Sequence, residues 1–598
     1  MSAKYIIGID LGTTNCVVAF ADLEAEEPSI ELLEIPQLVS AGTTETRPSL
    51  PSFAYLASEA EAKDGAFDLP WSTDRRFAVG ELARLRSAEA PQRTVGGAKS
   101  WLCHNKVDRR QPILPWNAPK DVEKVSPVTA TQRYLEHLVA TWEQQFTDAP
   151  FAEQQIVLTV PASFDPVARE LTREAALAAG LPQDFVLLEE PQAAVYAWLA
   201  AMGDRWRKLL KVGESLLVCD IGGGTTDLTL ISVAEEQGEL VLRRVAVGEH
   251  LLVGGDNMDL AMAHQVAAEF AKKGTKLNPW QSVSLWHSCR TAKEDLLAEE
   301  GSETHKISIL GRGSKVIGGA VSIEVEMKKI SKLLLDGFLP QCELDDKPQR
   351  QPSSGFQEIG LPYESDPAVT RHVAAFVSTH CGRDGETALP RHVLFNGGVF
   401  KAKGFRARLL EVLSKWGPKK SQPRALEGVH DLDHAVAKGA CYYGWNKEHG
   451  GMRIRGGVAA SYYVGIETSG LAIPGAPRPL KALCVVPFGM EEGTETDVPS
   501  NEIGLVLGQP ASFRFFSSSI RKHDQPGTVL DAWSEEELSE TDPLEATLSL
   551  KDGEDETYVP VKFRSRITEL GMFELWCVGT NGQGEWKLEF NVREEAED

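Results

Sequence analysis

The sequence predicts an α/β fold with two duplicated lobes over residues 1–445, followed by an all-β, sandwich-like domain over residues 459–598. Two observations predict the first part: a hairpin pattern occurs twice, and strands alternate with helices between and after the two copies. One observation predicts the second part. Beyond residue 459 apolar side chains alternate with polar ones at a period of two, as in Trp586, Leu588 and Phe590.

The repeated hairpin covers residues 4–20 and 215–233. Each copy has a β run that ends on a carboxylate, Asp10 or Asp220, then a glycine-threonine turn and a second β run. The turns read LGTTN and IGGGTTD. Because the pattern recurs, the sequence predicts a duplicated lobe. The predicted bounds are about 1–212 and 428–445 for lobe I and about 213–427 for lobe II.

The segment 165–180 predicts a helix by its ends as well as by its alanine-rich middle. Asp165 can cap the helix and Pro166 suits the first helical position. Next, FVLLEE predicts a strand that ends at Glu190, and Pro191 begins another helix. Gly397-Gly398 joins a further strand to a helix, and Asp433 stands at an expected helix start.

Two polar segments separate these elements. Residues 340–367 are proline-rich and predict a surface loop or insertion, and the glycine-rich residues 446–458 predict a linker. No helical pattern follows the β domain, so we expect no helical lid. The acidic tail REEAED predicts a solvated end.

Composition excludes several classes of function. The chain has 598 residues, a formal charge of −24 and a pI near 5.1, which argues against a broad nucleic-acid surface. No window approaches the roughly 20 apolar residues that span a bilayer, and the first residues lack a signal-peptide pattern. We therefore expect a cytoplasmic protein without nucleic-acid or membrane partners. The nine cysteines include no C-x-x-C pair, which predicts reduced thiols.

The glycine-threonine turns have a definite chemistry. Consecutive backbone amides in such turns bind phosphate oxygens, and glycine allows the close approach. Two such turns on facing lobes would hold a polyphosphate from both sides. Asp10, Asp220 and Asp227 would then face the same place, and carboxylates together with phosphates suit Mg²⁺.

Several segments together resemble the seventy-kilodalton heat-shock (DnaK-type) chaperone family, within the actin and sugar-kinase ATPase superfamily. GIDLGTTN resembles the first phosphate motif of that family and DIGGGTTD the second. The other similar segments are VPASF (160–164), EEPQAA (189–194), GGDNMD (254–259) and GAK (97–99). The resemblance covers about 1–445 and is fainter from YYVGIET (462–468) onward. It implies an actin-like ATPase domain that uses ATP/ADP and Mg²⁺.

The resemblance also implies site residues. Asp10, Asp220 and Asp227 would surround a hydrated Mg²⁺, Lys99 would lie beside the γ-phosphate, and Glu190 would order the attacking water. The catalytic set is Lys99, Glu190, Asp220, Asp227, Asp10 and Thr225. The cofactor-binding set is Gly12, Thr13, Thr14, Asn15, Gly222, Gly223, Gly224, Thr225, Gly254, Gly255, Lys293, Gly397, Gly398, Lys401 and Asp433. Pro161 and Arg169 match positions that pass nucleotide state between domains. A surface lysine is the alternative interpretation of Lys99, and a helix cap that of Asp433.

The sequence departs from the family at two places. On the adenosine side, Glu294 and Leu297 stand where the family often has basic or hydroxyl-bearing residues. Val399 and Lys401 stand where the family has Ser and Arg. Between the domains, GGMRIRGGVAASYYVG replaces the usual linker of aspartates and leucines. The first departure bears on adenine recognition, and the second on communication between the domains.

Three functions remain open at this point. The first is an ATP-hydrolysing chaperone-like protein whose β domain binds unfolded or extended polypeptide, with a J-domain cochaperone and a nucleotide exchange factor as implied partners. The second is a nucleotide-regulated scaffold or cochaperone with little turnover. The third is a small-molecule kinase, which the chaperone-like motifs disfavour. ATP turnover with and without an unfolded client distinguishes them.

Overall fold

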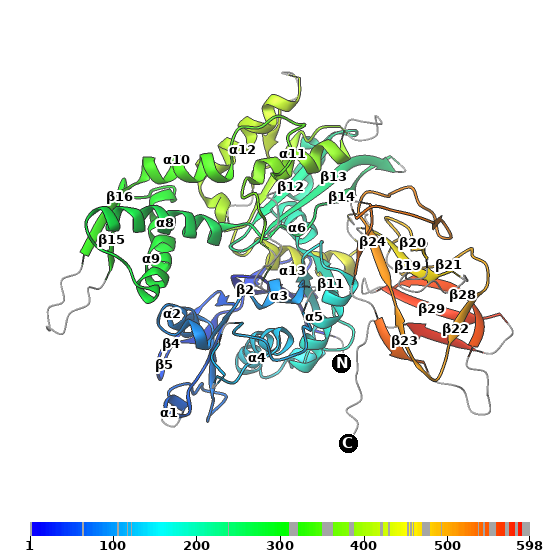
Figure 1. Ribbon diagram of the computed structural model, residues 1–598, viewed down its shortest axis with the longest axis horizontal. Helices are drawn as coiled ribbons and strands as arrows, with labels where there is room; N and C mark the ends of the chain where they lie inside the picture. Colours follow the sequence, from blue (N-terminus) through cyan, green and yellow to red (C-terminus); the bar gives the residue numbers. More distant parts are fainter. Residues whose placement is uncertain are drawn as a thin grey trace.

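Figure 1 shows the fold in a computed structural model of the chain. The structure describes residues 3–588 apart from these gaps: 63–64, 105–106, 117, 121, 237, 310–320, 350–360, 362, 382–387, 419–421, 429–430, 451–453, 455–456, 459, 469–478, 492, 536, 542–543, 549–557, 569–572 and 581–583. Parts of the predicted loop 340–367 and linker 446–458, and the whole acidic tail, therefore lie outside the described residues.

Lobe I is built on a mixed sheet in the order β11-β10-β1-β2-β3, with β6 also paired to β2. Its strands are β1 (Tyr5–Leu11), β2 (Asn15–Asp22), β3 (Glu31–Leu32), β6 (Leu50–Pro51), β10 (Gln155–Val160) and β11 (Val186–Glu189). The run YIIGIDL forms β1 because the strand is central: it pairs antiparallel with β2 and parallel with β10. Asp10 lies opposite Val17, one pair before the turn.

Lobe II repeats this arrangement in the order β14-β13-β12-β17-β18. Its strands are β12 (Ser215–Ile221), β13 (Thr226–Glu236), β14 (Glu239–Val247), β17 (His392–Asn396) and β18 (Arg424–Ala425). The central β12 pairs antiparallel with β13 and parallel with β17, so that Asp220 lies between Asp227 and Asn396. Both predicted hairpins are thus confirmed.

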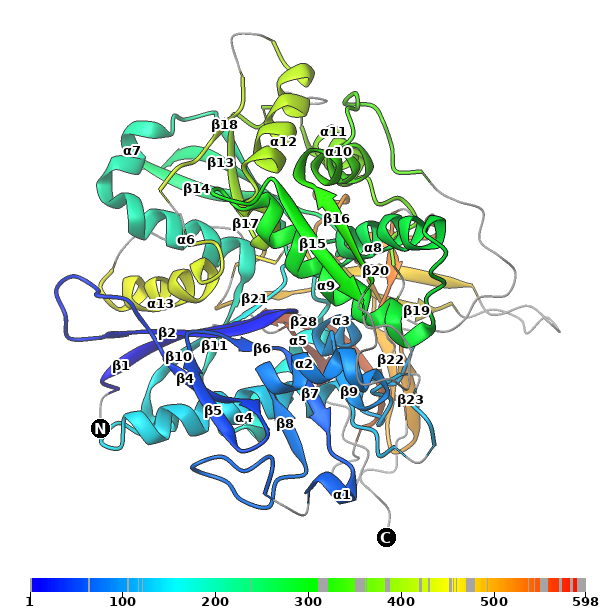
Figure 2. The ribbon, with the colours of Figure 1, turned by 90° about the vertical axis from the view of Figure 1, so that its left-hand side faces the viewer.

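Two helices lie between the sheets (Figure 2): α6 (Glu190–Met202) and α13 (Ala435–Glu448). Their side chains join the two lobes in one buried cluster that includes Ile6 of lobe I, Trp198 of α6 and Leu216 of lobe II. The helices cross closely, because a Cβ added at Gly439 of α13 would lie 1.8 Å from the Ala193 carbonyl oxygen of α6. This crossing fixes how the two lobes meet.

The helix predicted at 165–180 is α5 (Pro166–Ala178), and its cap is confirmed, since the Asp165 carboxylate accepts a hydrogen bond of 2.6 Å from the Ala168 amide. The strand before α6 ends at Glu189, so Glu190 is the first residue of the helix and not, as predicted, the last of the strand. Asp433 precedes the first residue of α13 by two positions, and His434 is the residue that flanks this helix.

The remaining elements of lobe I are α1 (Glu59–Ala62), α2 (Glu81–Glu89), η1 (Pro91–Arg93), α3 (Ala98–Leu102), α4 (Pro127–Gln145), η2 (Phe151–Glu153), η3 (Gly203–Arg205), α7 (Trp206–Leu209), β4 (Ile35–Ser40), β5 (Thr43–Arg47), β7 (Phe53–Leu56), β8 (Phe77–Val79) and β9 (Thr94–Gly96). Those of lobe II are α8 (Gly255–Lys272), α9 (Pro279–Leu297), α10 (Met327–Phe338), α11 (Val369–His380), η4 (Gly398–Lys401), α12 (Lys403–Trp416), β15 (Thr304–Ile309) and β16 (Val321–Glu326).

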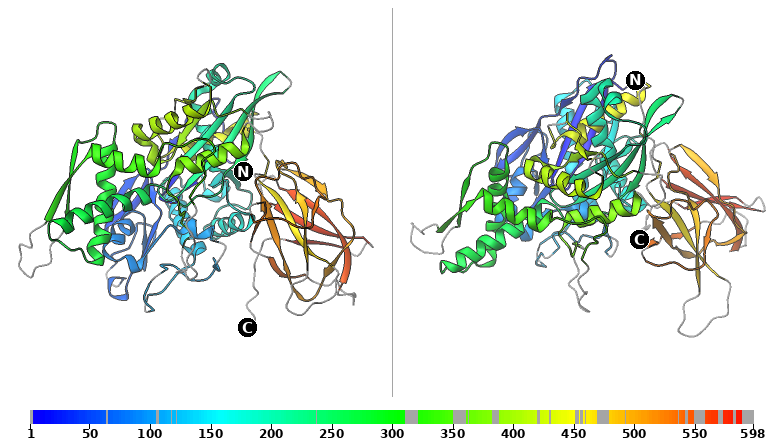
Figure 3. Two further views of the ribbon diagram at one scale, coloured as in Figure 1. Left: turned by 45° about the horizontal axis from the view of Figure 1, so that its top comes forward. Right: turned by 90° about the horizontal axis from the view of Figure 1, so that it is seen from above.

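Beyond α13 the described residues form strands only, set to one side of the lobes (Figure 3). They are β19 (Ser461–Glu467), β20 (Leu480–Val486), β21 (Thr494–Asp497), β22 (Ile503–Val506), β23 (Pro510–Phe513), β24 (Phe515–Ser518), β25 (Val529–Leu530), β26 (Ser539–Glu540), β27 (Leu544–Thr547), β28 (Tyr558–Ile567), β29 (Phe573–Gly579) and β30 (Glu585–Leu588). We call this the β region. Its apolar side chains join those of lobe I in one cluster, which contains Phe185 and Val464.

The predicted linker is partly structured. Helix α13 extends to Glu448, past the predicted boundary at residue 445. Ile454 is buried, and its amide donates a hydrogen bond of 2.9 Å to the Tyr196 hydroxyl of α6. The described linker residues are therefore held against the lobes. None of the helices in the described ranges is both long and apolar enough to span a bilayer.

The outer parts of the lobes meet where α2 faces α9, with His287 Nε2 3.3 Å from the Ser87 hydroxyl. Burial lowers the pKa of His287 to about 4, and Arg290 and Arg84 lower it further. The folded protein therefore favours the neutral imidazole, whereas the unfolded chain protonates near pH 6.5. This contribution to stability is complete above pH 6.5 and is lost as the pH falls toward 4.

We expect the thermal midpoint of the wild type to fall more steeply than that of His287→Gln between pH 6.5 and 4.5. Thermal unfolding followed by circular dichroism measures both curves. Parallel curves would contradict the assignment.

Candidate functional site

The two glycine-threonine turns face each other across the lobes. A Cβ added at Gly223 would lie 2.2 Å from the Thr14 hydroxyl oxygen, and one at Gly224 would lie 3.2 Å from Thr13 Cγ2. Only glycine fits at position 223 in this arrangement. Gly254, just before α8, approaches the same turn, because its added Cβ would lie 2.6 Å from the Gly223 carbonyl oxygen.

The remaining predicted turn residues belong to the same surroundings. Gly12 closes the first turn, since its added Cβ would lie 2.3 Å from the Asn15 carbonyl oxygen. The Gly222 amide donates to the Thr225 carbonyl across the second turn, at 2.9 Å. Gly397 has a φ of 84°, and its added Cβ would lie 2.5 Å from Asp220 Oδ1. The turn after β17 thus reaches the carboxylate at the end of β12.

Four carboxyl groups lie beside these turns: Glu190 and Asp227 are buried, and Asp10 and Asp220 are partly buried. Asp10 accepts a hydrogen bond of 3.4 Å from the Thr159 hydroxyl, and Asp220 accepts one of 2.7 Å from the Asn396 amide. The sequence analysis did not identify Asn396. Its register opposite Asp220, one residue before Gly397, follows only from the parallel pairing of β12 with β17.

Burial and mutual repulsion disfavour the charged forms of Asp10, Glu190 and Asp220. Burial, together with the nearby Glu190 charge, raises the pKa of Asp10 to about 7. Burial likewise raises the pKa of Asp220 to about 7, with contributions from Glu190 and Asp227. Two strand-end carboxylates are therefore only half ionised near neutral pH. A cation or a cationic side chain is needed to hold them both charged.

Lys99 supplies one such charge. It lies on the short helix α3, is 7% exposed, and forms an ion pair with Glu190 at the start of α6. Burial acts to lower the pKa of Lys99, but Glu190 and Asp10 outweigh it and the pKa is raised. Lys99 is thus a buried charged residue among carboxylates, and the alternative of a surface lysine is wrong.

His250 is a second positive group that sequence analysis missed. Its Nδ1 lies 3.2 Å from Asp227 Oδ1, and the Ser163 hydroxyl lies 3.1 Å from both atoms. Burial acts to lower the pKa of His250, but Cys103 and Asp227 raise it well above the usual value. Burial acts to raise the pKa of Asp227, and the His250 charge keeps it below its usual value. Asp227 is therefore the carboxylate of this group that stays ionised.

The donor chemistry fits Mg²⁺ held through water. Oxygen ligands from three strand ends converge, and Mg²⁺ usually keeps several waters. Within the described ranges, no three His, Cys, Asp or Glu side chains are close enough together to bind a metal directly. Asp10, Asp220 and Asp227 would accordingly hold the ion largely through its water shell, and the ion would supply charge neutralisation for phosphate.

The predicted adenosine-side residues already have partners. Lys293 Nζ lies 2.7 Å from the buried Asp259 carboxylate and donates to the Gly255 carbonyl at 3.0 Å. Lys401 of η4 forms an ion pair with Asp433, and both side chains are about half exposed. Gly398 begins η4, where an added Cβ would meet no atom within 4 Å. Asp433 thus links lobe II to the start of α13 and does not cap that helix.

Comparisons with known proteins bear on this geometry. Residues 71–337 match the family model described as Hsp70 protein. Over 308 residues the chain is 29% identical to the chaperone protein DnaK of Stenotrophomonas maltophilia (strain R551-3), a match that covers 50% of this chain and 44% of that protein. Over these residues the chain is similar to the Hsp70 family. The match spans less than half the length of the relative.

The Hsp70 match includes most of the candidate site. Lys99, Glu190, the second turn and its carboxylates, His250 and Lys293 all fall within residues 71–337. The first turn with Asp10, the Gly397 turn and the β region fall outside it. The Hsp70 match implies the two-lobed, actin-like arrangement, in which the first turn faces the second.

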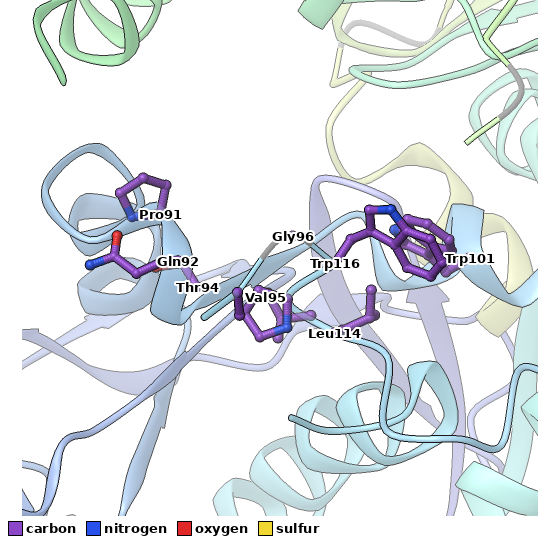
Figure 4. Close-up of a pocket in the computed structure, with 10 residues that line it drawn as sticks. Pro91, Gln92, Thr94, Val95, Gly96, Trp101, Leu114 and Trp116 are labelled. Carbon is purple, nitrogen blue, oxygen red and sulfur yellow. The ribbon is translucent and has the colours of Figure 1, made fainter. Parts of the chain in front are cut away.

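A cavity of about 370 Å³ lies next to α3 (Figure 4). Trp101 and Trp116 line one end with stacked rings, whose centroids are 4.7 Å apart, and Pro91 and Gln92 line the other. None of the predicted site residues lines it. The cavity borders α3, the helix that carries Lys99, through Trp101.

Proposed function

We propose that the protein binds ATP with Mg²⁺, hydrolyses it slowly to ADP and phosphate, and acts as a chaperone of the Hsp70 type. One observation carries the proposal: two glycine-threonine turns face each other beside four carboxyl groups, which are buried or partly buried, and one buried lysine. Phosphoryl transfer depends on positioning and charge stabilisation, and this arrangement offers both.

Each group of site residues has a separate role in the proposed reaction. The amides and hydroxyls of the two turns bind the phosphates, and Lys99 stabilises the charge that develops on the γ-phosphate. Glu190, fixed by its ion pair with Lys99, orients the attacking water. Asp227, kept ionised by His250, together with Asp10 and Asp220, holds the hydrated Mg²⁺. Because the bound ion neutralises Asp10 and Asp220, its binding should release protons near pH 7.

The β region is the proposed site for unfolded or extended polypeptide. The similarity to a DnaK chaperone supports this, and so do the antiparallel sheets of the described β region, since extended chains bind by adding to sheet edges. A J-domain cochaperone and a nucleotide exchange factor are the proposed protein partners, and the cytoplasm is the proposed location.

A direct contact between the lobes and the β region supports coupling without the family linker. Arg244 of β14 has a fully buried side chain, and it forms an ion pair with Glu189 and donates to the Gly457 carbonyl of the linker. Glu189 also accepts from Arg169 at 3.0 Å. Since Glu189 precedes Glu190, a movement of the phosphate site would reach the linker through Arg244.

A second contact lies next along the same strand. Lys522 of the β region donates a hydrogen bond of 2.8 Å to the Val245 carbonyl of β14. The β region therefore rests on two successive residues of lobe II, and also on the apolar cluster that it shares with lobe I. Rotation of the lobes would change both contacts.

We expect Arg244→Gln to abolish the stimulation of ATP turnover by an unfolded client, while the unstimulated rate changes less than about threefold. Breaking a buried ion pair also costs about 3–5 kcal/mol, so the unfolding midpoint should fall. Arg243→Gln is the matched control, because Arg243 is half exposed and pairs with Glu236 instead. Equal stimulation in Arg244→Gln and the wild type would refute the coupling.

A scaffold that binds nucleotide with little turnover is the second candidate. The observation that favours it is that Lys293 and Lys401 are occupied by Asp259 and Asp433, so neither offers an unpaired charge to the nucleoside. ATP turnover by the full chain, with Mg²⁺ and with or without an unfolded client, tests both. Slow hydrolysis that the client stimulates supports the chaperone, and binding without hydrolysis supports the scaffold. Phosphate transferred to a small molecule would identify a kinase.

A further inference from the structure

A cluster of polar side chains with buried, unpaired atoms lies in lobe I between residues 68–77 and α4, outside the residues of the candidate site; His137 is buried, and Asp68, Arg75 and Arg133 are partly buried. In the described part of the chain, twelve buried side-chain nitrogen or oxygen atoms have no hydrogen-bond partner. Four of them belong to this cluster: Asp68 Oδ1, Arg75 Nη1, Arg133 Nη1 and His137 Nδ1. Buried polar atoms are normally paired, so their concentration at one place indicates a missing partner.

Three of the four side chains contact aromatic rings, and the charge of the fourth, Asp68, acts on Arg75. The guanidinium carbons of Arg75 and Arg133 lie 4.7 and 4.1 Å from the centre of the Phe77 ring, so they are at most about 9 Å apart. His137 lies one helical turn after Arg133 on α4 and is 3% exposed, and its ring contacts Trp71 edge to face at 5.1 Å. Figure 2 shows β8, which carries Phe77, beside α4.

The two arginines are not neutralised by direct contact. Burial, together with the Arg133 charge, lowers the pKa of Arg75 to about 10. The charges of Asp68, Glu123 and Glu136 act on the pair from a distance, but neither Nη1 atom donates a hydrogen bond to them. Glu136 instead accepts from Gln132 at 2.8 Å. The Nη1 atoms of Arg75 and Arg133 are therefore two positively charged donors without a hydrogen-bond acceptor among the described residues.

The other two atoms are acceptors. His137 Nε2 lies 2.9 Å from the Pro36 carbonyl oxygen, which can only accept, so Nε2 carries the proton. Burial lowers the pKa of His137 to about 4, so the ring is neutral at pH 7 and Nδ1 has a lone pair. Asp68 Oδ1 is an acceptor as well. A matching ligand must accept hydrogen bonds, donate at least one, and carry negative charge.

We propose that Asp68, Arg75, Arg133 and His137 form a binding site for inorganic phosphate as the monohydrogen dianion. Its unprotonated oxygens accept from the two arginines, and its hydroxyl donates to Asp68 or His137. Sulfate has the same shape and charge but no hydrogen to donate, so it leaves the acceptors unpaired. This site is independent of the proposed ATPase function.

Isothermal titration of the full chain at pH 7.5 with sodium phosphate, and separately with sodium sulfate, tests the proposal. We expect saturable phosphate binding and sulfate binding at least about tenfold weaker, because a buried acceptor left unpaired is costly. Saturating ADP, which would occupy the phosphate turns, should leave phosphate binding here unchanged, and this separates the two sites. Absence of saturable phosphate binding, or equal binding of sulfate, overturns the proposal.

Two variants and a control locate the binding. Arg133→Gln should weaken phosphate binding about tenfold or more, and Asp68→Asn should reduce the preference for phosphate over sulfate. Arg173→Gln is the matched control, because Arg173 also lies over a phenylalanine ring but donates to the Gln183 carbonyl at 3.0 Å. Wild-type affinity in Arg133→Gln would refute the site.

If a variant fails to fold by circular dichroism, wild-type crystals soaked in arsenate, which keeps the hydroxyl of phosphate, give an independent answer. We expect anomalous density between Arg75 and Arg133. Water alone at that position overturns the proposal.

Discussion

Replacing Lys99 by alanine should lower ATP turnover by about 10²–10³-fold and leave ATP bound, because Lys99 stabilises transition-state charge while the turn amides hold the nucleotide. Lys99 is the buried cation that pairs with Glu190 and raises the ionisation of Asp10. Single-turnover hydrolysis and equilibrium titration with a fluorescent ATP analogue measure the two effects separately.

Two companion variants sharpen this test. Lys124→Ala is the control, since Lys124 lies in the same lobe and donates to the Trp116 carbonyl at 3.0 Å, away from the carboxylates. It should keep the wild-type rate. Lys99→Met with Glu190→Gln removes both charges of the buried pair, so a loss of rate in that variant cannot come from an unpaired carboxylate. Full turnover in Lys99→Ala would exclude Lys99 from catalysis.

Gly439→Ala should be among the most destabilising single substitutions, with a loss of about 3 kcal/mol or more in the free energy of unfolding. The added Cβ would lie 1.8 Å from the Ala193 carbonyl oxygen and 2.9 Å from the Ala197 amide nitrogen. Both are backbone atoms of α6, so the two helices between the lobes would have to move apart. Urea denaturation measures the loss.

Gly404→Ala is the matched control for this substitution. Gly404 also lies in a helix, α12, but a Cβ there would meet no atom within 4 Å. Alanine should therefore stabilise that helix by about 0.5–1 kcal/mol. Equal stability of Gly439→Ala and the wild type would contradict the close crossing of α6 and α13.

The sequence predicted both hairpins and the helix α5, because these features depend on neighbouring residues. A strand that ends on a carboxylate and a turn rich in glycine and threonine form a local pattern, and so do Asp165 and Pro166 at the start of α5. The recurrence of the hairpin 210 positions later also predicted two lobes, since identical patterns build identical units.

The partners of the site residues depend on the tertiary structure. Asn396 reaches Asp220 across 176 positions, and Lys99 pairs with Glu190 across 91. Neither His250 nor Arg244 stands out in the sequence, because no local pattern shows which strand or helix a distant charge will face. The same holds for Lys401 and Asp433. The sequence predicted that both contact nucleotide, whereas in the structure they form an ion pair with each other.

The sequence by itself predicted the proposed phosphate-binding chemistry of the two turns, because that chemistry would lie in the backbone amides of a short glycine-rich segment. The tertiary structure alone decided which charges neutralise one another and how the β region meets the lobes. The physical reason is that burial and Coulomb interactions depend on distances between segments, and those distances are set by the packing of α6, α13 and the two sheets.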